Sequence, residues 1–405
     1  MSQITVQKFG GTSVADPDRI REVADHAVRT HKRGTDVVLV VSAMGKETDQ
    51  LLRLADDVSR TKPSREMDML ITAGERKAMS LVAMAISDLG VNAQSFTGSQ
   101  AGFITDTSHT DAKIVELRPG RISEAIENGC IPVIGGSQGV STDKNVTFLG
   151  RGGSDTTAVA IAHALGAEIC ELYTDVAGVY SADPRIVSKA GRMPEISFDE
   201  LLEMTATGCP KPAMRSVEFA RRHEVKLHIR SAFTWEPGTI VKEHTDMEQA
   251  VVNAVTHDTS EAKVTVSGVS DQPGIAARMF TVLAESGINV DMIVQNTSDH
   301  GRTDISFTVP HAEAEEATEL INGLSGEVGA AGCGFDHDIG RVSVVGAGMK
   351  SNPGVAAKMF QVLADNDINI EMISTSAIRI SCVVQQSQVE RAVEILHTAF
   401  DLDVS

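Results

Sequence analysis

The C-terminal part of this chain contains two similar copies of one sequence segment. Lys263 to Gly268 is matched by Arg341 to Gly346, and Pro273 to Phe280 is matched by Pro353 to Phe360. A repeat this long indicates two copies of one structural unit. Each copy reads as a strand, a Pro-Gly loop, an amphipathic helix, two strands and a second helix, which is the βαββαβ order of a ferredoxin-like unit.

The second copy is too short to complete its own sheet, because only Asp401 to Ser405 follow its last helix. We hypothesise that a spare strand ahead of the first copy, Val251 to His257, completes it. A chain of 405 residues is also too long for one ordinary core. We therefore expect three domains: an N-terminal domain at 1-245, a strand with the first unit at 246-337, and a second unit at 338-405 that strand 250-257 completes.

Short strand patterns alternate with longer helical patterns from Met1 to about Val241, which predicts an α/β sandwich with a mostly parallel sheet. Asp16 and Pro17 give a helix start signal. Trp235 to Gly238 is interpreted as a domain boundary because proline and glycine end the strand pattern there. The expected strands are Ile4 to Phe9, Asp36 to Ser42, Ile131 to Gly135, Glu168 to Thr174 and Lys226 to Ile229, and the helices include Asp18 to His31, Glu75 to Leu89 and Thr156 to Leu165.

Composition excludes several classes of protein. A formal net charge of -19 argues against nucleic-acid or anionic-membrane binding, since like charges repel at long range. No stretch reaches the ~18 apolar residues of a membrane span, and no signal peptide precedes the first strand. The five cysteines are scattered and have no zinc-like spacing, so we read them as reduced thiols of a cytoplasmic protein without a metal site of its own.

A lysine and two glycines end the first strand. Lys8 supplies a positive charge, while Gly10 and Gly11 let backbone amides approach an anion closely. The chain has no G-x-x-x-x-G-K-[ST] motif and no protein-kinase signature, so this loop is not a P-loop. A plain strand-to-helix turn is the alternative interpretation.

A second glycine cluster opens a helix of small residues. Arg151 lies among Gly150, Gly152 and Gly153, so an arginine fork, backbone amides and a helix dipole come together. Ser154 or Asp155 are candidates to cap this helix, but capping does not account for the arginine.

Three further motifs carry charged or hydroxyl groups. Gly74, Glu75 and Arg76 are expected to begin a helix, where Glu75 is placed to hold a substrate ammonium and Arg151 a carboxylate, with a solvated ion pair as the alternative. Thr174 and Asp175 follow a strand end of an α/β sheet, where ligand loops usually gather. The run from Gly178 to Arg185 continues the same loop.

These motifs together resemble the amino-acid kinase superfamily, and within it the aspartate kinases. The resemblance lies in Lys8 to Ser13, Gly74 to Arg76, Phe96 to Gly102, Gly150 to Thr157 and Tyr173 to Arg185, in that family's order. The duplicated unit is similar to that family's paired ACT domains. It is most similar to the lysine- and threonine-sensitive bacterial type.

The resemblance implies that ATP, with Mg²⁺, and L-aspartate give ADP and 4-phospho-L-aspartate, the entry to lysine, threonine and methionine biosynthesis. It implies catalytic roles for Lys8, Asp155 and Glu75, with Asp155 orienting Lys8. The implied nucleotide-binding residues are Lys8, Gly10, Gly11, Ser42, Thr174, Asp175, Tyr180, Asp183, Arg185 and Lys211. The implied substrate-binding residues are Thr48, Glu75, Arg151, Gly152, Gly153 and Ser154.

Regulation and assembly also follow from the resemblance. Threonine or lysine would bind between paired copies, so a homo-oligomer or a hetero-oligomer with a small regulatory subunit is expected. Met247 lies where related enzymes start such a subunit. The implied effector-site residues are Asp271, Gly274, Ile275, Ala276, Asn289, Asp291, Gln295, Asn369, Ile370 and Ser376.

The chain departs from the family pattern at three positions. Pro210 stands where these enzymes carry a nucleotide-binding lysine, with Lys211 next to it, and Ala177 replaces an acidic residue. Ala377 replaces a glutamate, which predicts weakened or lost lysine inhibition. Two alternatives stay open: a kinase for another small amino acid, and a weakly catalytic subunit that senses amino acids.

Overall fold

The computed structural model describes residues 3–243, 251–296 and 300–403. Its contacts divide the chain into two compact units. The first unit comprises Met1–Val179, Arg192–Thr205 and Pro210–Met247, and the second comprises Tyr180–Gly191, Ala206–Cys209 and Glu248–Ser405. The start expected at Met247 lies outside the described residues, as do the boundary at 245/246 and residue 250 of the expected strand.

The first unit is built on a large sheet whose described strands run in the order β10-β12-β11-β9-β1-β2-β6-β3. All neighbouring pairs are parallel except β11 with β12. Val37 to Val41 of β2 are all buried, as expected for a strand covered on both faces. The strands are β1 (Ile4–Phe9), β2 (Asp36–Val41), β3 (Ala93–Phe96), β6 (Ile131–Gly135), β9 (Ile169–Thr174), β10 (Glu195–Ser197), β11 (Leu227–Ser231) and β12 (Thr239–Lys242).

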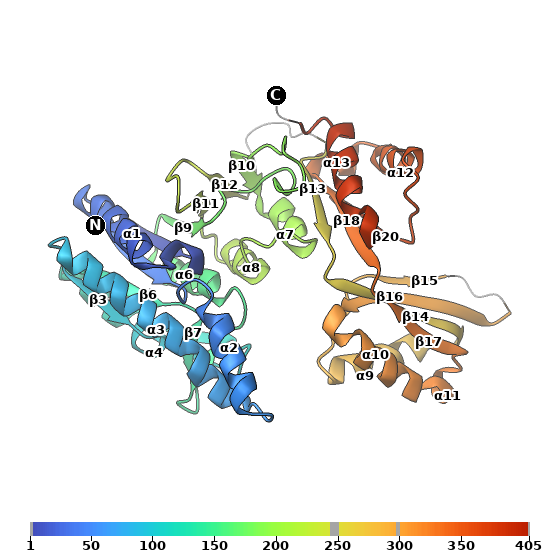
Figure 1. Cartoon of the computed structure of the whole chain (residues 1–405), viewed down its shortest axis with the longest axis horizontal. Coiled ribbons are helices and arrows are strands. Elements are labelled where there is room, and N and C mark those ends of the chain that lie inside the picture. The colour runs from blue at the N-terminus through green and yellow to red at the C-terminus, as the bar shows by residue number, and fades with distance from the viewer. Residues whose placement is uncertain (1–2, 244–250, 297–299, 404–405) are drawn as a thin grey trace. The chain divides into compact units, whose positions relative to one another are not determined.

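Helices cover this sheet, as Figure 1 shows for α1 and α3. Phe9, Leu39 and Val41 pack with α1 and α3 in one apolar cluster. Lys8 alternates with Phe9 along β1 and so points to the other face, where α6 contacts the strand. The helices are α1 (Pro17–Lys32), α2 (Glu47–Val58), α3 (Ser64–Asp88), α5 (Gly120–Glu127), α6 (Gly153–Leu165), α7 (Phe198–Ala206) and α8 (Met214–Arg222).

A smaller sheet of the first unit has the strand order β5-β4-β7-β8. Its members are β4 (Phe103–Thr105), β5 (Ile114–Leu117), β7 (Gln138–Ser141) and β8 (Val146–Phe148), with the short helix α4 (Gly98–Ala101) ahead of them. This sheet brings the loop between β4 and β5 next to Phe148, because the Ala112 N–H donates to the Phe148 carbonyl at 2.9 Å.

Three local expectations need correction. Gly74 does not begin a helix: α3 starts at Ser64, and a Cβ at Gly74 would lie 2.8 Å from the Ala43 Cβ, so glycine permits close packing there. Trp235 to Gly238 is a hairpin turn between β11 and β12, not the end of the sheet. The N-cap of α6 is Gly152, in the left-handed region at φ 72° and without a side-chain cap.

By contrast, the Asp16 side chain accepts hydrogen bonds from the Asp18 and Arg19 amides and caps α1, which confirms that start signal.

The second unit contains the two repeated copies, and its sheets are antiparallel. The first copy has the order β15-β16-β14-β17. Met279 and Leu283 of α9 and Ile321 of α10 pack on this sheet with Val264 and Phe307. Its elements are β14 (Glu261–Ser270), α9 (Ile275–Glu285), β15 (Ile293–Gln295), β16 (Arg302–Pro310), α10 (Ala314–Gly323), α11 (Ser325–Val328) and β17 (Gly332–Asp336).

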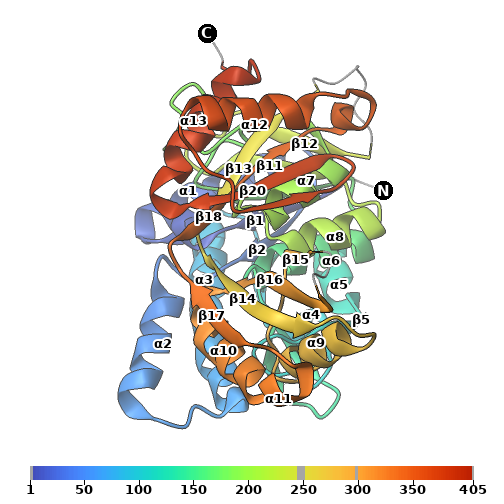
Figure 2. The same ribbon diagram turned by 90° about the vertical axis from the view of Figure 1, so that its right-hand side faces the viewer.

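The sheet of the second copy has the order β13-β18-β20-β19. The edge strand β13 precedes the first copy in the chain and pairs with β18 from Ala254–Val345 to Asp258–Arg341. Helices α12 and α13 lie along one face of this sheet (Figure 2). Its elements are β13 (Ala254–Asp258), β18 (Ile339–Val345), α12 (Val355–Asp365), β19 (Met372–Thr375), β20 (Arg379–Gln385) and α13 (Val389–Ala399).

Two short segments, Tyr180–Gly191 and Ala206–Cys209, belong to the second unit although the chain around them belongs to the first. Ala182, Val187 and Ala190 pack in the core of the second copy. Ser181 Oγ lies 2.8 Å from His397 Nε2, and His397 Nδ1 lies 2.9 Å from an oxygen of Asp403. These contacts fix the Tyr180–Gly191 segment to the C-terminal helix of the second copy. None of the described helices is both long and apolar enough to cross a membrane.

Candidate active site

A pocket of about 650 Å³ opens at the carboxyl ends of β1 and β9 in the first unit. In open α/β sheets this edge is where ligands usually bind. The pocket is lined by Lys8, Gly10, Gly11, Ser42, Thr48, Asp49, Leu52, Met67, Ile71, Glu75, Thr110, Ser137, Phe148, Gly150, Arg151, Gly152, Ser154, Asp155, Thr174, Pro210, Lys211 and Ala213.

Lys8 is held by a carboxylate from the first turn of α6. Its Nζ lies 2.6 Å from Asp155 Oδ1, and the two side chains are 13% and 10% exposed. The other oxygen of Asp155 accepts the Ala213 N–H at 3.1 Å. Asp155 therefore fixes the lysine and the loop before α8 at the same time.

Glycines let the backbone come close to this lysine. A Cβ at Gly10 would stand 3.6 Å from Lys8 Nζ, and one at Gly11 only 2.8 Å from the Ala43 carbonyl oxygen, so Gly11 admits no side chain without a shift. Ser154 Oγ at the start of α6 lies 3.0 Å from Ser42 Oγ and 2.9 Å from Ser137 Oγ. A helix N-terminus beside hydroxyls and a lysine favours anions such as phosphate.

Glu75 brings a buried carboxylate into the same pocket. It is 3% exposed, and its Oε2 has no hydrogen-bond partner. Burial raises the pKa of Glu75 to about 7, against smaller lowering effects of its own backbone and that of Ala43. A cation brought beside it would satisfy the free oxygen and restore the ionised form.

Asp175 and Lys211, for which the family resemblance implied nucleotide binding, form an ion pair. Lys211 Nζ lies 2.7 Å from Asp175 Oδ1, which also accepts from Thr174 Oγ1 at 2.9 Å. Burial alone would raise the pKa of Asp175, but the hydrogen bonds from Lys211 and Thr174 bring it below its usual value. Lys211 thus reaches the pocket wall despite the adjacent Pro210.

Most of the sequence-predicted site residues line this single pocket, and five do not. One of the five is Asp175, which contacts the pocket lining through its ion pair with Lys211. Gly153 is the first residue of α6 and is buried. The remaining residues of that group, Tyr180, Asp183 and Arg185, belong to the Tyr180–Gly191 segment of the second unit. There the Arg185 guanidinium pairs with Asp183 at 2.6 Å.

Sequence reasoning missed several lining residues. Ser137 follows the end of β6, so the strand-end rule that selected Thr174 applied there as well. Asp49 is one residue from Thr48 and carries no motif of its own. Thr110 comes from a loop outside every motif, and only the packing of the small sheet places it in the pocket.

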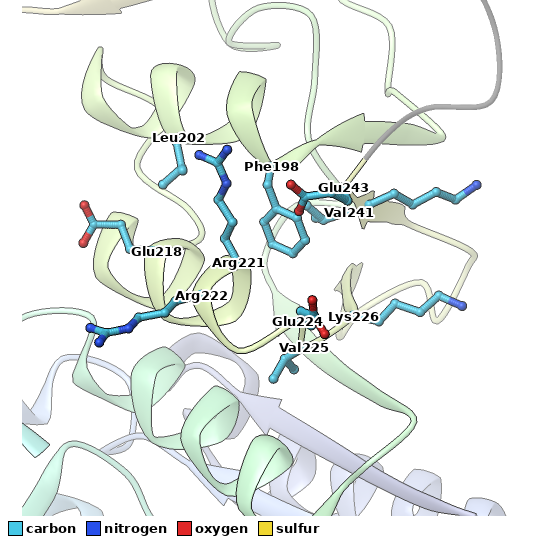
Figure 3. Close-up of a pocket in the computed structure, with 11 residues that line it drawn as sticks. Phe198, Leu202, Glu218, Arg221, Arg222, Glu224, Val225, Lys226, Val241 and Glu243 are labelled. Carbon is cyan, nitrogen blue, oxygen red and sulfur yellow. The ribbon is translucent and has the colours of Figure 1, made fainter. Parts of the chain in front are cut away.

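A second concavity, a groove of about 980 Å³, lies between α7, α8 and the ends of β11 and β12 (Figure 3). Phe198 and Val241 form an apolar floor. Arg221, on its wall, pairs with Asp199 at 2.7 Å, and Lys242 pairs with Glu195 at 2.6 Å. Because these two cations are matched by carboxylates and no glycine is among the described residues that line the groove, it is a weaker candidate for a phosphate site than the pocket around Lys8.

The predicted effector residues lie in the second unit. Gly274 is the N-cap of α9 in the left-handed region, with Ile275 and Ala276 in its first turn. Asp291 already pairs with the buried Arg341, which also lies 3.5 Å from Asp258 and 3.4 Å from Glu261. The other predicted residues, Asp271, Asn289, Gln295, Asn369, Ile370 and Ser376, are exposed or half-buried.

Residues 3–231 match the amino acid kinase family, and residues 264–323 and 342–400 match the ACT domain. An aspartokinase of Mycolicibacterium smegmatis is 53% identical over 405 residues, covering 98% of this chain and 96% of that relative. The chain belongs to the aspartokinase family. It is therefore a kinase, an enzyme that phosphorylates aspartate, and its recognition from the motifs is confirmed.

Solved structures agree with the fold. An aspartate kinase from Synechocystis is 39% identical, with a TM-score of 0.56 over 100% of this chain and 70% of that one. The E. coli aspartokinase III structure in complex with aspartate and ADP has a TM-score of 0.84, covers 98% of this chain and 99% of its own, and is 24% identical. The predicted fold class, a mostly parallel α/β domain followed by paired ferredoxin-like units, is confirmed. Among the described residues, no group of three or more His, Cys, Asp and Glu is arranged to hold a metal ion.

Proposed function

We propose that this aspartokinase transfers the γ-phosphoryl group of ATP to the side-chain carboxylate of L-aspartate, giving ADP and 4-phospho-L-aspartate. This reaction would begin lysine, threonine and methionine biosynthesis in the cytoplasm. One observation carries the proposal: a phosphate-binding arrangement around Lys8 and a buried, unpaired carboxylate of Glu75 line the same pocket.

The chemistry needs electrostatic help more than proton transfer. An ionised carboxylate is already a nucleophile, so its attack on the phosphoryl group requires no general base. What opposes the reaction is repulsion between two anions. Lys8, held by Asp155 at 2.6 Å, and the N-terminus of α6 offset that repulsion where the charge develops.

Glu75 and Arg151 orient the acceptor in this proposal. The ammonium of aspartate pairs with the free oxygen of Glu75, and the α-carboxylate pairs with the exposed guanidinium of Arg151. Thr48 and Ser154 complete the amino-acid half of the pocket. Bidentate recognition by an arginine adds direction as well as charge.

The nucleotide occupies the half of the pocket formed by Gly10, Gly11, Thr174 and Lys211, and Lys211 is paired with Asp175. Mg²⁺ accompanies ATP, keeps several waters and takes one or two carboxylates besides the phosphates. The carboxylates of Asp155 and Asp49 and the hydroxyls of Ser42 and Ser154 line the pocket and suit such an ion. When bound, the ion neutralises part of the phosphate charge.

Hydroxylamine trapping tests this reaction. The purified chain is incubated with ATP and Mg²⁺ and, in parallel, with L-aspartate, L-glutamate or other small amino acids. We expect equal amounts of ADP and hydroxamate with aspartate, and little with the others. A preference for another amino acid, or ADP release that does not depend on which amino acid is supplied, would contradict the proposal.

Feedback is a second part of the proposal. Threonine is expected to inhibit through the Pro-Gly loop at Gly274 and the facing Asn289, in an oligomer where two copies pair. Lysine is expected to inhibit weakly, because Ala377 offers no carboxylate for its ammonium. We expect Ala377→Glu to increase lysine inhibition; strong inhibition of the unchanged chain at micromolar lysine contradicts this.

A further inference from the structure

The loop between β4 and β5 carries a strained residue into the pocket. Thr110 has φ 70°, in the left-handed region that a β-branched side chain rarely adopts. It is also one of the residues that line the pocket. Strained backbone persists only where its surroundings hold it in place, and it gathers at functional sites.

Asp68 holds this conformation. It lies on α3, is 0% exposed, and uses both carboxylate oxygens on the same loop. Oδ1 accepts the Thr110 N–H at 2.9 Å, and Oδ2 lies 2.6 Å from His109 Nδ1. Side chains seven residues apart share one helix face, so Asp68 and Glu75 are presented by the same face of α3.

The same loop supports the backbone that leads to Arg151. A Cβ at Gly150 would stand 2.9 Å from Asp111 Oδ1 and 3.5 Å from the Thr110 carbonyl oxygen. The Ala112 N–H donates to the Phe148 carbonyl at 2.9 Å. Asp68 is therefore linked through Thr110 to the turn before Arg151.

We propose that Asp68 and His109 are positioning residues for the amino-acid substrate. They act through Thr110, which forms part of the pocket wall. This inference rests on the proposed function, in which Glu75 and Arg151 hold the substrate amino acid. The two groups must stand at a fixed separation to hold a small zwitterion. Asp68 sets this separation, because it lies on the helix that carries Glu75 and its carboxylate binds the loop that packs against the turn before Arg151.

The proposal predicts different effects on the KM values of aspartate and ATP. Loss of the Asp68–His109 contact is expected to raise the KM for aspartate by about tenfold to a hundredfold, since small misplacements of orienting groups have effects of that order. The KM for ATP should stay within about twofold, because the nucleotide half of the pocket does not use this loop.

Steady-state kinetics of His109→Ala, His109→Asn and Thr110→Gly test the proposal in the full-length enzyme. Asparagine places an N–H near the position of His109 Nδ1, so His109→Asn is expected to restore most of the affinity for aspartate that His109→Ala loses. Thr110→Gly relieves the strained backbone but removes the wall. We expect it to unfold at or above the temperature of the unchanged chain and to bind aspartate more weakly.

Aspartate binding by calorimetry gives a readout that does not depend on turnover. A selective loss of aspartate affinity in His109→Ala and Thr110→Gly, with recovery in His109→Asn, supports the proposal. Unchanged aspartate affinity, or equal losses for aspartate and ATP, overturns it. The unchanged chain in the hydroxylamine-trapping assay reports separately on the proposed function, because it either produces ADP and hydroxamate from aspartate or does not.

Discussion

The Lys8 ammonium lies 2.6 Å from the Asp155 carboxylate, joining the end of the first strand to the first turn of α6. The two residues come from glycine-bearing loops that are far apart in the sequence. Because Asp155 also accepts the Ala213 N–H, this carboxylate sets both the charge and the shape of the pocket floor.

Lys8→Ala should lower kcat by about a hundredfold to a thousandfold, the usual cost of removing one group that stabilises developing charge. Asp155→Asn should lower it less, because the lysine remains but loses its anchor. Lys226→Ala, outside this pocket, serves as the control. Rates come from coupled ADP release, with circular dichroism to check folding. A near-normal rate for Lys8→Ala would refute its role.

Aspartate binding near neutral pH should release a proton from Glu75. The free carboxyl has a pKa of about 7, and pairing with an ammonium favours its ionised form. Calorimetry in buffers of different ionisation enthalpy measures this release. Glu75→Gln should abolish both the proton release and the rise in aspartate KM expected as pH falls below 7. Binding heats that do not vary with the buffer in the unchanged chain would contradict the assignment.

Stability should also depend on Glu75. Its folded-state pKa lies above the unfolded value of 4.5, so its favourable contribution is complete below pH 4.5 and is lost as pH rises through about 7. Relative to the unchanged chain without substrate, Glu75→Gln should therefore gain up to ~3 kcal/mol between pH 4.5 and 8. Urea unfolding at both pH values checks the sign, and a variant that loses stability over this range contradicts it.

Lys211→Met should raise the KM for ATP by about tenfold and leave the KM for aspartate unchanged, since a lysine acts on phosphate as a point charge. Lys211 and Asp175 are 44% and 45% exposed, so the free energy of unfolding should change by less than ~1 kcal/mol. High salt should reduce the difference in KM. If the two KM values change together, Lys211 does not serve the nucleotide half.

Arg341→Met should destabilise the second unit by about 3–5 kcal/mol, because Arg341 is 2% exposed and pairs with Asp258, Glu261 and Asp291. Burial raises the pKa of Glu261, Arg341 lowers it, and the other two carboxylates raise it further. Arg278→Met removes an exposed ion pair with Glu327 and is the matched control, expected to change stability by less than ~1 kcal/mol. Chemical unfolding compares them; equal effects would contradict the importance of burial.

The repeat and the strand-end motifs were readable from the sequence because they depend on local order. Ligand loops gather at the carboxyl ends of parallel strands, so Thr174, which ends a strand, was a candidate site residue. Glu75 was predicted as a site residue from its charge, but the prediction that a helix begins at Gly74 was wrong, because α3 begins at Ser64. Gly74 looked like a helix boundary, whereas it is a contact with Ala43 that only packing reveals.

By itself, the sequence determined the parallel α/β domain, the duplicated C-terminal unit and the two glycine-bearing loops of the pocket, because periodicity and glycine placement act over a few residues. Tertiary structure alone decided the register in which β13 pairs with β18, that Asp291 pairs with Arg341, and that Asp68 holds Thr110 in the pocket. These contacts join residues that are distant in the chain, and no local sequence pattern predicts which distant residues come into contact.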